Sequence, residues 1–186
     1  DSTDLWIFRA LLPHFRAAVY SVEYNSHFPL EAAVTFPDDP AERWQEDRGY
    51  GASLGALAMV AAEHGYSLVA VQPTLDAFFI RNDLIDDGSG ELAPPLEHWR
   101  DATQLCHHAP LRDPARAGIF LDYRVWRETG GDEAAARDAA LKVTVRSLSA
   151  SSWRQRIHNL CRTPVRLVLA PARVLRRGLR VRASHS

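Results

Sequence analysis

The order of the apolar runs between residues 18 and 84 constrains the fold of this chain more than any other feature. Residues 18–24, 67–71 and 77–81 are short runs rich in β-branched and aromatic side chains, which favours strands, and we expect the first strand to be buried. Residues 72–76 alone separate the last two runs, which is too short a connection for a crossover between parallel strands. We therefore expect an antiparallel hairpin at the end of an otherwise parallel sheet.

Apolar residues at helical spacing occur on both sides of the first predicted strand. In residues 3–14 this spacing predicts an amphipathic helix capped by Ser2 or Thr3. A second helix is predicted in residues 50–64, just before Gly65, because glycine suits the left-handed position after a helix. The intervening residues 25–48 contain three prolines and many charges, so we expect a long loop that is functional or mobile.

The chain after the hairpin is predicted to extend this α/β unit. Residues 86–95 contain two glycines and two adjacent prolines, which we expect to end the compact domain. Asp132 is the expected N-cap of a strong helix from Glu133 to about Leu148. The predicted organisation is an α/β domain in residues 1–92, a mixed and helical extension in 93–150 and a basic tail in 151–186.

The net charge of −1 conceals an asymmetry between the tail and the rest of the chain. Residues 151–186 contain nine Arg and no acidic residue, whereas residues 1–150 carry 13 basic and 23 acidic side chains. The tail could therefore attract the acidic body, or it could lie on an anionic membrane surface. Contact with nucleic-acid phosphate is the least favoured of the three alternatives.

Composition and terminal patterns indicate where such a chain would reside. No apolar run approaches the roughly 20 residues that span a bilayer, and the first residues lack the pattern of a secretory signal. Cys106 and Cys161 lie far apart, without the spacing of a disulfide framework. We expect a cytoplasmic protein, peripheral to a membrane if the tail binds one. Because the chain begins at Asp1 without an initiator Met, we also expect a fragment or a trimmed chain.

Glu23, Asn25 and Asp1 are the candidate catalytic residues. Strand alternation would place Glu23 and Asn25 on one face, about 6 to 7 Å apart at the strand's exit, where ligands bind in open α/β sheets. Alternatively, these two side chains could cap nearby backbone or pair with an arginine such as Arg48. Asp1 could orient an acceptor group at the same edge or take its proton.

His27, Tyr50 and Ser53 are the candidate substrate-binding residues. His27 could act as a general base, or it could be a solvated loop histidine. Tyr50 could line an acceptor pocket or act as a lid over the core. Ser53 belongs to a glycine-containing helix start whose amides could bind an anion, although a plain turn would have the same sequence.

A cluster of metal-binding residue types occurs further along the chain. Cys106, His107 and His108 are consecutive, and His98 precedes them. Adjacent histidines point in different directions on any regular element, and no second ligand pair lies at a useful spacing. We therefore predict no metal site.

Five ordered segments carry a family resemblance: DSTDLWI (1–7), SVEYNS (21–26), YGASLGAL (50–57), GYSLV (65–69) and DAFFIR (76–81). Together they resemble the C-terminal half of class I S-adenosylmethionine-dependent methyltransferase-like proteins of bacteria and algae and, less closely, the layout of FkbM-type methyltransferases. The resemblance covers residues 1–84 and implies an α/β fold with a partial Rossmann-like sheet and a reversed terminal strand, followed here by a helical and Arg-rich C-terminal extension. It places Asp1 at the end of the fourth strand, with the three apolar runs as the fifth, sixth and seventh.

The resemblance implies methyl transfer to an oxygen or nitrogen acceptor of unknown identity. The glycine-rich turn and the acidic residue that normally hold S-adenosylmethionine are not in this chain, so we expect the cofactor to bind in the intact protein only, through residues that stay unknown. The segment alone is expected to be inactive. The alternative function is a non-catalytic interaction or peripheral membrane-binding module that uses the basic tail.

Overall fold

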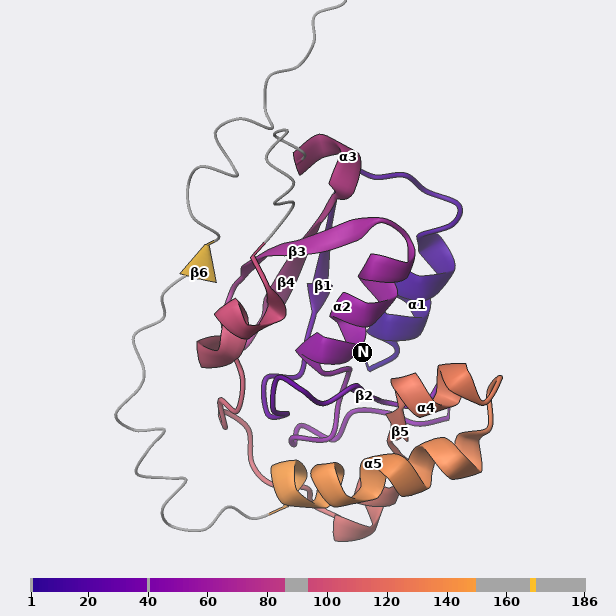
Figure 1. Ribbon diagram of the computed structural model, residues 1–186. Helices are drawn as coiled ribbons and strands as arrows, with labels where there is room; N and C mark the ends of the chain where they lie inside the picture. Colours follow the sequence, from indigo (N-terminus) through magenta and orange to yellow (C-terminus); the bar gives the residue numbers. More distant parts are fainter. Residues whose placement is uncertain (1, 40, 86–93, 150–167, 170–186) are drawn as a thin grey trace, which may run out of the picture.

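The computed structural model describes residues 2–39, 41–85, 94–149 and 168–169 of the chain. Within these residues the architecture is mixed α/β, with a four-stranded sheet, a two-stranded sheet and helices packed against them (Figure 1). The strands are β1 (Val19–Glu23), β2 (Val34–Thr35), β3 (Tyr66–Val71), β4 (Asp76–Arg81), β5 (Leu121–Asp122) and β6 (Val168–Leu169). The helices are α1 (Asp4–Leu11), α2 (Leu54–Glu63), α3 (Asn82–Ile85), α4 (Tyr123–Glu128) and α5 (Glu133–Leu148), with 3₁₀ helices η1 (Leu96–Ala102) and η2 (Pro114–Ile119).

Strand β4 determines the topology of the larger sheet. The strand order is β1-β4-β3-β6, and β4 pairs antiparallel with both β1 and β3. The hairpin predicted from the last two apolar runs is therefore confirmed, whereas the otherwise parallel sheet is not seen among the described residues, where every strand pair of this sheet is antiparallel. Because β1 and β3 both oppose β4, they run in the same direction, and one reversed strand lies between them.

Strand β1 is less buried than its apolar sequence predicts. It lies at the edge of the sheet within the described residues. Its register places Val22 opposite Ala77, and both of these side chains are buried in the core. The alternate residues Val19, Ser21 and Glu23 are exposed. The prediction of a buried strand is thus wrong for one face, because the helices packed on this end of the sheet cover only the other face.

Helices α1 and α2 lie on the same side of the larger sheet (Figure 1). Phe8 of α1 packs against Phe79 of β4, with ring centroids 5.3 Å apart. Ser53 caps α2 by accepting a hydrogen bond from the Ala56 amide, and Gly65 follows the helix with a φ of +76°. Both predicted helices are confirmed with narrower bounds, since the capping residue lies three positions inside the predicted start of the second helix.

Residues 25–48, which are predicted to form a long functional or mobile loop, contain buried side chains and a short strand. Phe28 and Phe36 are buried there and form a second apolar cluster with Phe120 and with Leu148 of α5. Strand β2 lies within this stretch and pairs antiparallel with β5. The aromatic residues between the prolines explain the difference, because burying their apolar surface outweighs the cost of fixing an irregular backbone.

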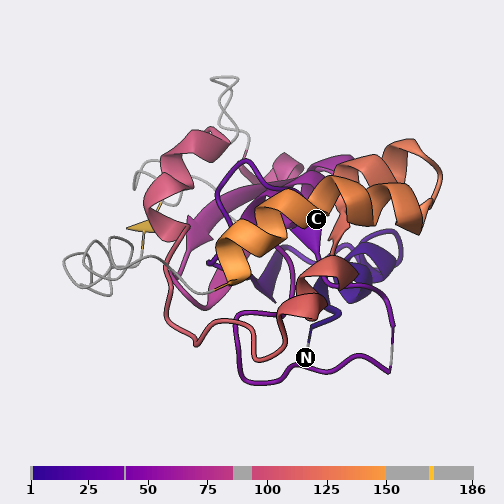
Figure 2. The same ribbon diagram turned by 90° about the horizontal axis from the view of Figure 1, so that it is seen from below.

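Residues 94–149 share the hydrophobic core of the preceding residues. Trp99 and Tyr123 belong to the same buried cluster as Leu5 of α1. Helices α4 and α5 lie side by side at one end of the molecule, as both views show (Figures 1 and 2). Helix α5 confirms the sequence prediction, and the Asp132 side chain caps it by accepting a hydrogen bond from the Ala135 amide.

The basic tail, residues 151–186, lies outside the described residues except for Val168 and Leu169. These two residues form β6, which pairs antiparallel with the end of β3. The electrostatic alternatives for the tail therefore stay predictions. None of the described helices is long and apolar enough to cross a membrane.

Gly55 marks a close approach between α2 and the chain that precedes β2. A Cβ at this position would lie 2.5 Å from the Ala32 carbonyl oxygen and 2.7 Å from the Leu30 carbonyl oxygen. Backbone atoms cannot swing aside as a flexible side chain does, so Gly55→Ala should lower the free energy of unfolding by about 1 to 3 kcal/mol. Urea unfolding should show a lower midpoint at an unchanged slope.

Gly118→Ala is the matched control for this change. An added Cβ at Gly118 would meet no atom within 4 Å, so the midpoint should stay at the wild-type value or rise slightly. Equal midpoints for the two variants would contradict the close approach at Gly55.

Candidate functional site at the end of strand β1

The side chain of Asn25 joins the end of β1 to the segment that leads into α2. Its Nδ2 donates hydrogen bonds to the carbonyl oxygens of Arg48, at 2.8 Å, and Tyr50, at 2.7 Å. Its Oδ1 accepts a hydrogen bond from the backbone amide of His27 at 3.0 Å. Asn25 is 1% exposed. Every hydrogen-bonding group of this amide is thus occupied by backbone, and Asn25 positions the site rather than contacting a ligand directly.

Ser53 has a similar role at the start of α2. Its hydroxyl donates to the Ala32 carbonyl oxygen at 2.7 Å and accepts from the Val34 amide at 3.0 Å, in addition to capping the helix. The residue is completely buried. These contacts fix the chain before β2 against the start of α2, so Ser53 holds the backbone of the site in place.

The carboxylate of Glu23 is partly exposed to solvent and has a raised pKa. Partial burial is the main cause of the higher pKa, and the negative charges of Asp4 and Asp76 raise it further. Asp76 lies directly opposite Glu23 in the β1–β4 register, which explains its influence. A carboxylate with a raised pKa is a better proton acceptor, so Glu23 is suited to act as a general base.

Tyr50 lies beside a group of three histidines. Its side chain is buried, and its hydroxyl lies 3.4 Å from Nε2 of His107. Burial raises the pKa of this phenol, and the charge of Glu23 raises it further. The ring also contacts those of His27 and His108 edge-on, with centroids 6.1 and 5.4 Å away. Tyr50 therefore stays a neutral hydroxyl beside the imidazoles.

His27, His107 and His108 form what we call the imidazole cluster. His27 stacks on His107 with ring centroids 4.7 Å apart, and the centroids of His107 and His108 are 4.2 Å apart. His27 is 2% exposed, and neither of its ring nitrogens has a hydrogen-bond partner within the described residues. Burial holds the pKa of His27 well below its usual range, and the neighbouring charges of His107 and Arg48 lower it further. The cluster is thus neutral at physiological pH.

Metal binding is not indicated at the imidazole cluster. The described ranges contain no group of three or more His, Cys, Asp or Glu side chains arranged to hold a metal ion. The nearly parallel rings of His27 and His107, 16° apart, place their nitrogens in neighbouring planes rather than around a common centre.

Arg48 and Asp47 support the cluster through buried polar contacts. The Arg48 guanidinium donates to the carbonyl oxygens of His108 and Ser149, each at 3.1 Å. The Asp47 carboxylate accepts hydrogen bonds from the amides of Gly49, at 2.8 Å, and Arg112, at 2.9 Å. Arg48 is therefore engaged with backbone far along the chain, rather than with Glu23 as one sequence alternative proposed.

The structure brings together most of the residues that the sequence singled out. Glu23, Asn25, His27 and Tyr50 lie around the end of β1, and Ser53 supports them. Asp1 lies outside the described residues. Strand alternation predicts Glu23 and Asn25 on one face, but β1 ends at Glu23 and the Asn25 side chain is buried in the protein.

Sequence reasoning considered His107 and His108 only as metal ligands and missed their contact with His27 and Tyr50. About 80 residues separate His27 from His107, and both occur in segments without regular periodicity. The adjacent pair of histidines was the only local feature of the sequence that pointed to this part of the site.

Comparison of the chain with models of protein families, with curated proteins and with solved structures found no match.

Replacing Asn25 should destabilise the fold because its buried hydrogen-bond partners would be left unpaired. In Asn25→Ala, the carbonyl oxygens of Arg48 and Tyr50 and the amide of His27 would lose a hydrogen bond in a buried environment. Since each such group costs about 1 to 3 kcal/mol, we expect the free energy of unfolding to fall by at least about 2 kcal/mol in urea titrations. Ser21→Ala, on the exposed face of β1, should change it by less than about 0.5 kcal/mol.

Protonation of His27 should make folding depend on pH. The unfolded chain takes up a proton near the ordinary histidine pKa of 6.5, whereas folded His27 stays neutral until well below it. Between the lowered pKa of folded His27 and the ordinary value of 6.5, the unfolded state holds more protons than the folded state. The free energy of unfolding therefore rises with pH by up to about 1.4 kcal/mol per pH unit in this range and levels off above pH 6.5. His27→Phe keeps an aromatic ring and should reduce this slope in urea titrations.

The same series contains its own control above pH 6.5, where wild type and His27→Phe should differ by a constant amount. An identical slope for both proteins at lower pH would exclude a buried neutral His27.

Proposed function

We propose that residues 2–85 are the acceptor-side portion of a methyl-transferring α/β domain that uses S-adenosylmethionine as its methyl donor. The observation that carries this proposal is the sheet order, in which β4 runs antiparallel between β1 and β3. A reversed last strand is the feature that the family resemblance implies for this part of the chain. The hairpin connection alone did not require β4 to lie beside β1 as well.

The open side of the sheet also supports the proposal. The residues of β1 that face away from α1 and α2 are exposed, including Val19 at 49%. Ile7 of α1 and Phe15, which follows α1, are exposed at 55% and 62%. An uncovered edge strand beside exposed apolar side chains is suited to pairing with further strands and helices of a larger Rossmann-like sheet.

Glu23 is the residue through which this portion would take part in the reaction. A hydroxyl or amine acceptor loses a proton as its oxygen or nitrogen forms a new bond to carbon. The raised pKa of Glu23 and its exposed position at the carboxyl end of β1 suit it to accept that proton. Tyr50, whose backbone carbonyl accepts a hydrogen bond from the Asn25 side chain, would orient the acceptor through its hydroxyl.

The donor would be held by residues other than these. No glycine-rich turn follows β1. The side chains of Asn25 and Ser53 already form hydrogen bonds with backbone groups, so the described residues do not fit the ribose-containing cofactor. We therefore assign no step on S-adenosylmethionine to this chain. Its described residues would shape the acceptor site and receive the proton.

The alternative, a membrane-binding module, depends on residues 151–186. These lie outside the described residues apart from Val168 and Leu169, so no structural observation favours it. An anionic membrane surface as the partner of the tail therefore stays a prediction from charge alone.

Glu23→Gln tests the proposed function in the protein encoded by the complete reading frame. The assay supplies S-adenosylmethionine with an isotopically labelled methyl group, together with candidate hydroxyl and amine acceptors. Loss of a general base should lower the rate of label transfer by about 10² to 10⁴-fold. The Kd of S-adenosylmethionine, measured by calorimetry, should not change, because Glu23 is assigned to the acceptor.

Glu97→Gln is the charge-matched control, since Glu97 is an exposed residue of η1 away from β1. It should transfer label at the wild-type rate. Absence of S-adenosylmethionine binding to the wild-type protein would reject the methyltransferase proposal, and wild-type transfer by Glu23→Gln would remove Glu23 from the reaction.

A further inference from the structure

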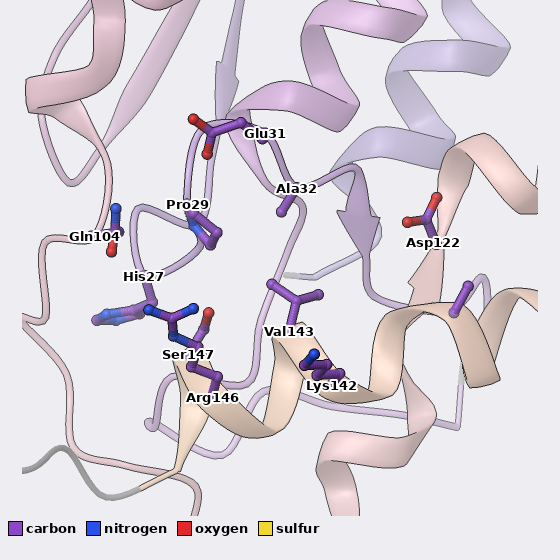
Figure 3. A pocket seen from close by; sticks show the side chains of 11 residues that line it. His27, Pro29, Glu31, Ala32, Gln104, Asp122, Lys142, Val143, Arg146 and Ser147 are labelled. Carbon is purple, nitrogen blue, oxygen red and sulfur yellow. The ribbon is translucent and has the colours of Figure 1, made fainter.

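A pocket of about 540 Å³ lies between the segment that follows β1 and helix α5 (Figure 3). Residues 27–32 form one wall, and Lys142, Val143 and Arg146 of α5 form the other. Figure 3 shows His27 and Gln104 toward one end of the pocket and Asp122 toward the other. The volume falls within the range of roughly 300 to 1,000 Å³ that is usual for small-molecule sites.

Two acidic and two cationic residues line this pocket, and within the described residues only the acidic side chains form hydrogen bonds or ion pairs. Of its two acidic residues, Glu31 pairs with Arg100 at 2.6 Å. The other, Asp122, accepts hydrogen bonds from the amides at the start of α4. By contrast, no carboxylate within the described ranges forms an ion pair with Lys142 or Arg146.

Lys142 and Arg146 are also placed to act together. They are four residues apart in α5, so their side chains lie on the same face of the helix, and both line the pocket. Two cations at this spacing repel each other when no anion lies between them. An anionic group bound in the pocket would remove that repulsion and contact both side chains.

His27 gives an independent indication of a ligand. It lines the pocket, is 2% exposed and has two ring nitrogens without a partner among the described residues. Both nitrogens are buried behind the pocket wall. Buried polar groups in folded proteins are nearly always hydrogen-bonded, so a molecule in the pocket would supply the missing partner once the ring turns toward it. A neutral imidazole offers one donor and one acceptor.

We propose that this pocket binds a small organic anion whose carboxylate or phosphate group contacts Lys142 and Arg146. The apolar part of the ligand would lie against Pro29, Ala32 and Val143, and a polar group would reach the His27 ring. This site is distinct from the carboxylate at Glu23 and does not depend on methyl transfer.

The test uses the full 186-residue chain and three matched probes: phenyl phosphate, benzoate and neutral benzyl alcohol. Calorimetry should detect binding of one or both anions and no binding of the alcohol. Binding of phenyl phosphate alone would identify a phosphorylated ligand, and binding of benzoate alone would identify a carboxylic acid. Failure of both anions to bind at millimolar concentration would overturn the proposal.

Lys142→Ala and Arg146→Ala should each weaken binding of the anionic probe by about tenfold or more, corresponding to about 1.4 kcal/mol. Both side chains are exposed, so the variants are expected to fold. Arg137→Ala is the charge-matched control, because Arg137 belongs to α5, pairs with Glu133 and does not line the pocket. Equal weakening by the control would show a general charge effect and reject the site.

Nuclear magnetic resonance of the histidine rings provides a second readout. The ring signals of His27 should shift on addition of the anionic probe, whereas those of His14, an exposed residue after α1, should stay in place. Binding that leaves the His27 signals unchanged would place the anion elsewhere on the protein and contradict the proposal.

Discussion

The buried side-chain amide of Asn25 is the interaction on which the candidate site depends. Its hydrogen bonds to the backbone of Arg48, Tyr50 and His27 fix both the direction of the chain after β1 and the position of the segment that enters α2. The edge strand, the imidazole cluster and the Tyr50 ring thereby become one rigid unit. A carboxylate in place of this amide could accept hydrogen bonds but could not donate to the two carbonyl oxygens.

Burial has opposite effects on the two kinds of titratable group that this unit holds. It raises the pKa of Glu23 and lowers the pKa of His27, because in both cases the charged form loses hydration. Neighbouring like charges act in the same direction, from Asp4 and Asp76 on Glu23 and from Arg48 and His107 on His27. Both groups are therefore shifted toward their uncharged forms, which moves the pKa of Glu23 toward pH 7 and the pKa of His27 away from it.

Elements defined by local pattern were predictable, and those defined by long-range packing were not. The β3–β4 hairpin follows from a short connection between two apolar runs, and α5 follows from its Asp132 cap and its helical residues. The exposed face of β1 and the burial of residues 25–48 depend on which surfaces other elements cover. Composition alone therefore suggested a fully buried strand and a long loop, without indicating the exposed face of the strand or the buried aromatic residues of the loop.

The sequence by itself determined the strands and helices around the reversed β4 and selected Glu23, His27 and Tyr50, since apolar spacing, caps and polar residues at a strand end are local signals. Only the tertiary structure decided that Asn25 faces inward, that His27 stacks on His107 and that α5 lies across from residues 27–32 with Lys142 and Arg146. The physical reason is distance along the chain. These contacts join segments about 20 to 120 residues apart, where packing and hydrogen-bond satisfaction decide the pairing and no local pattern records it.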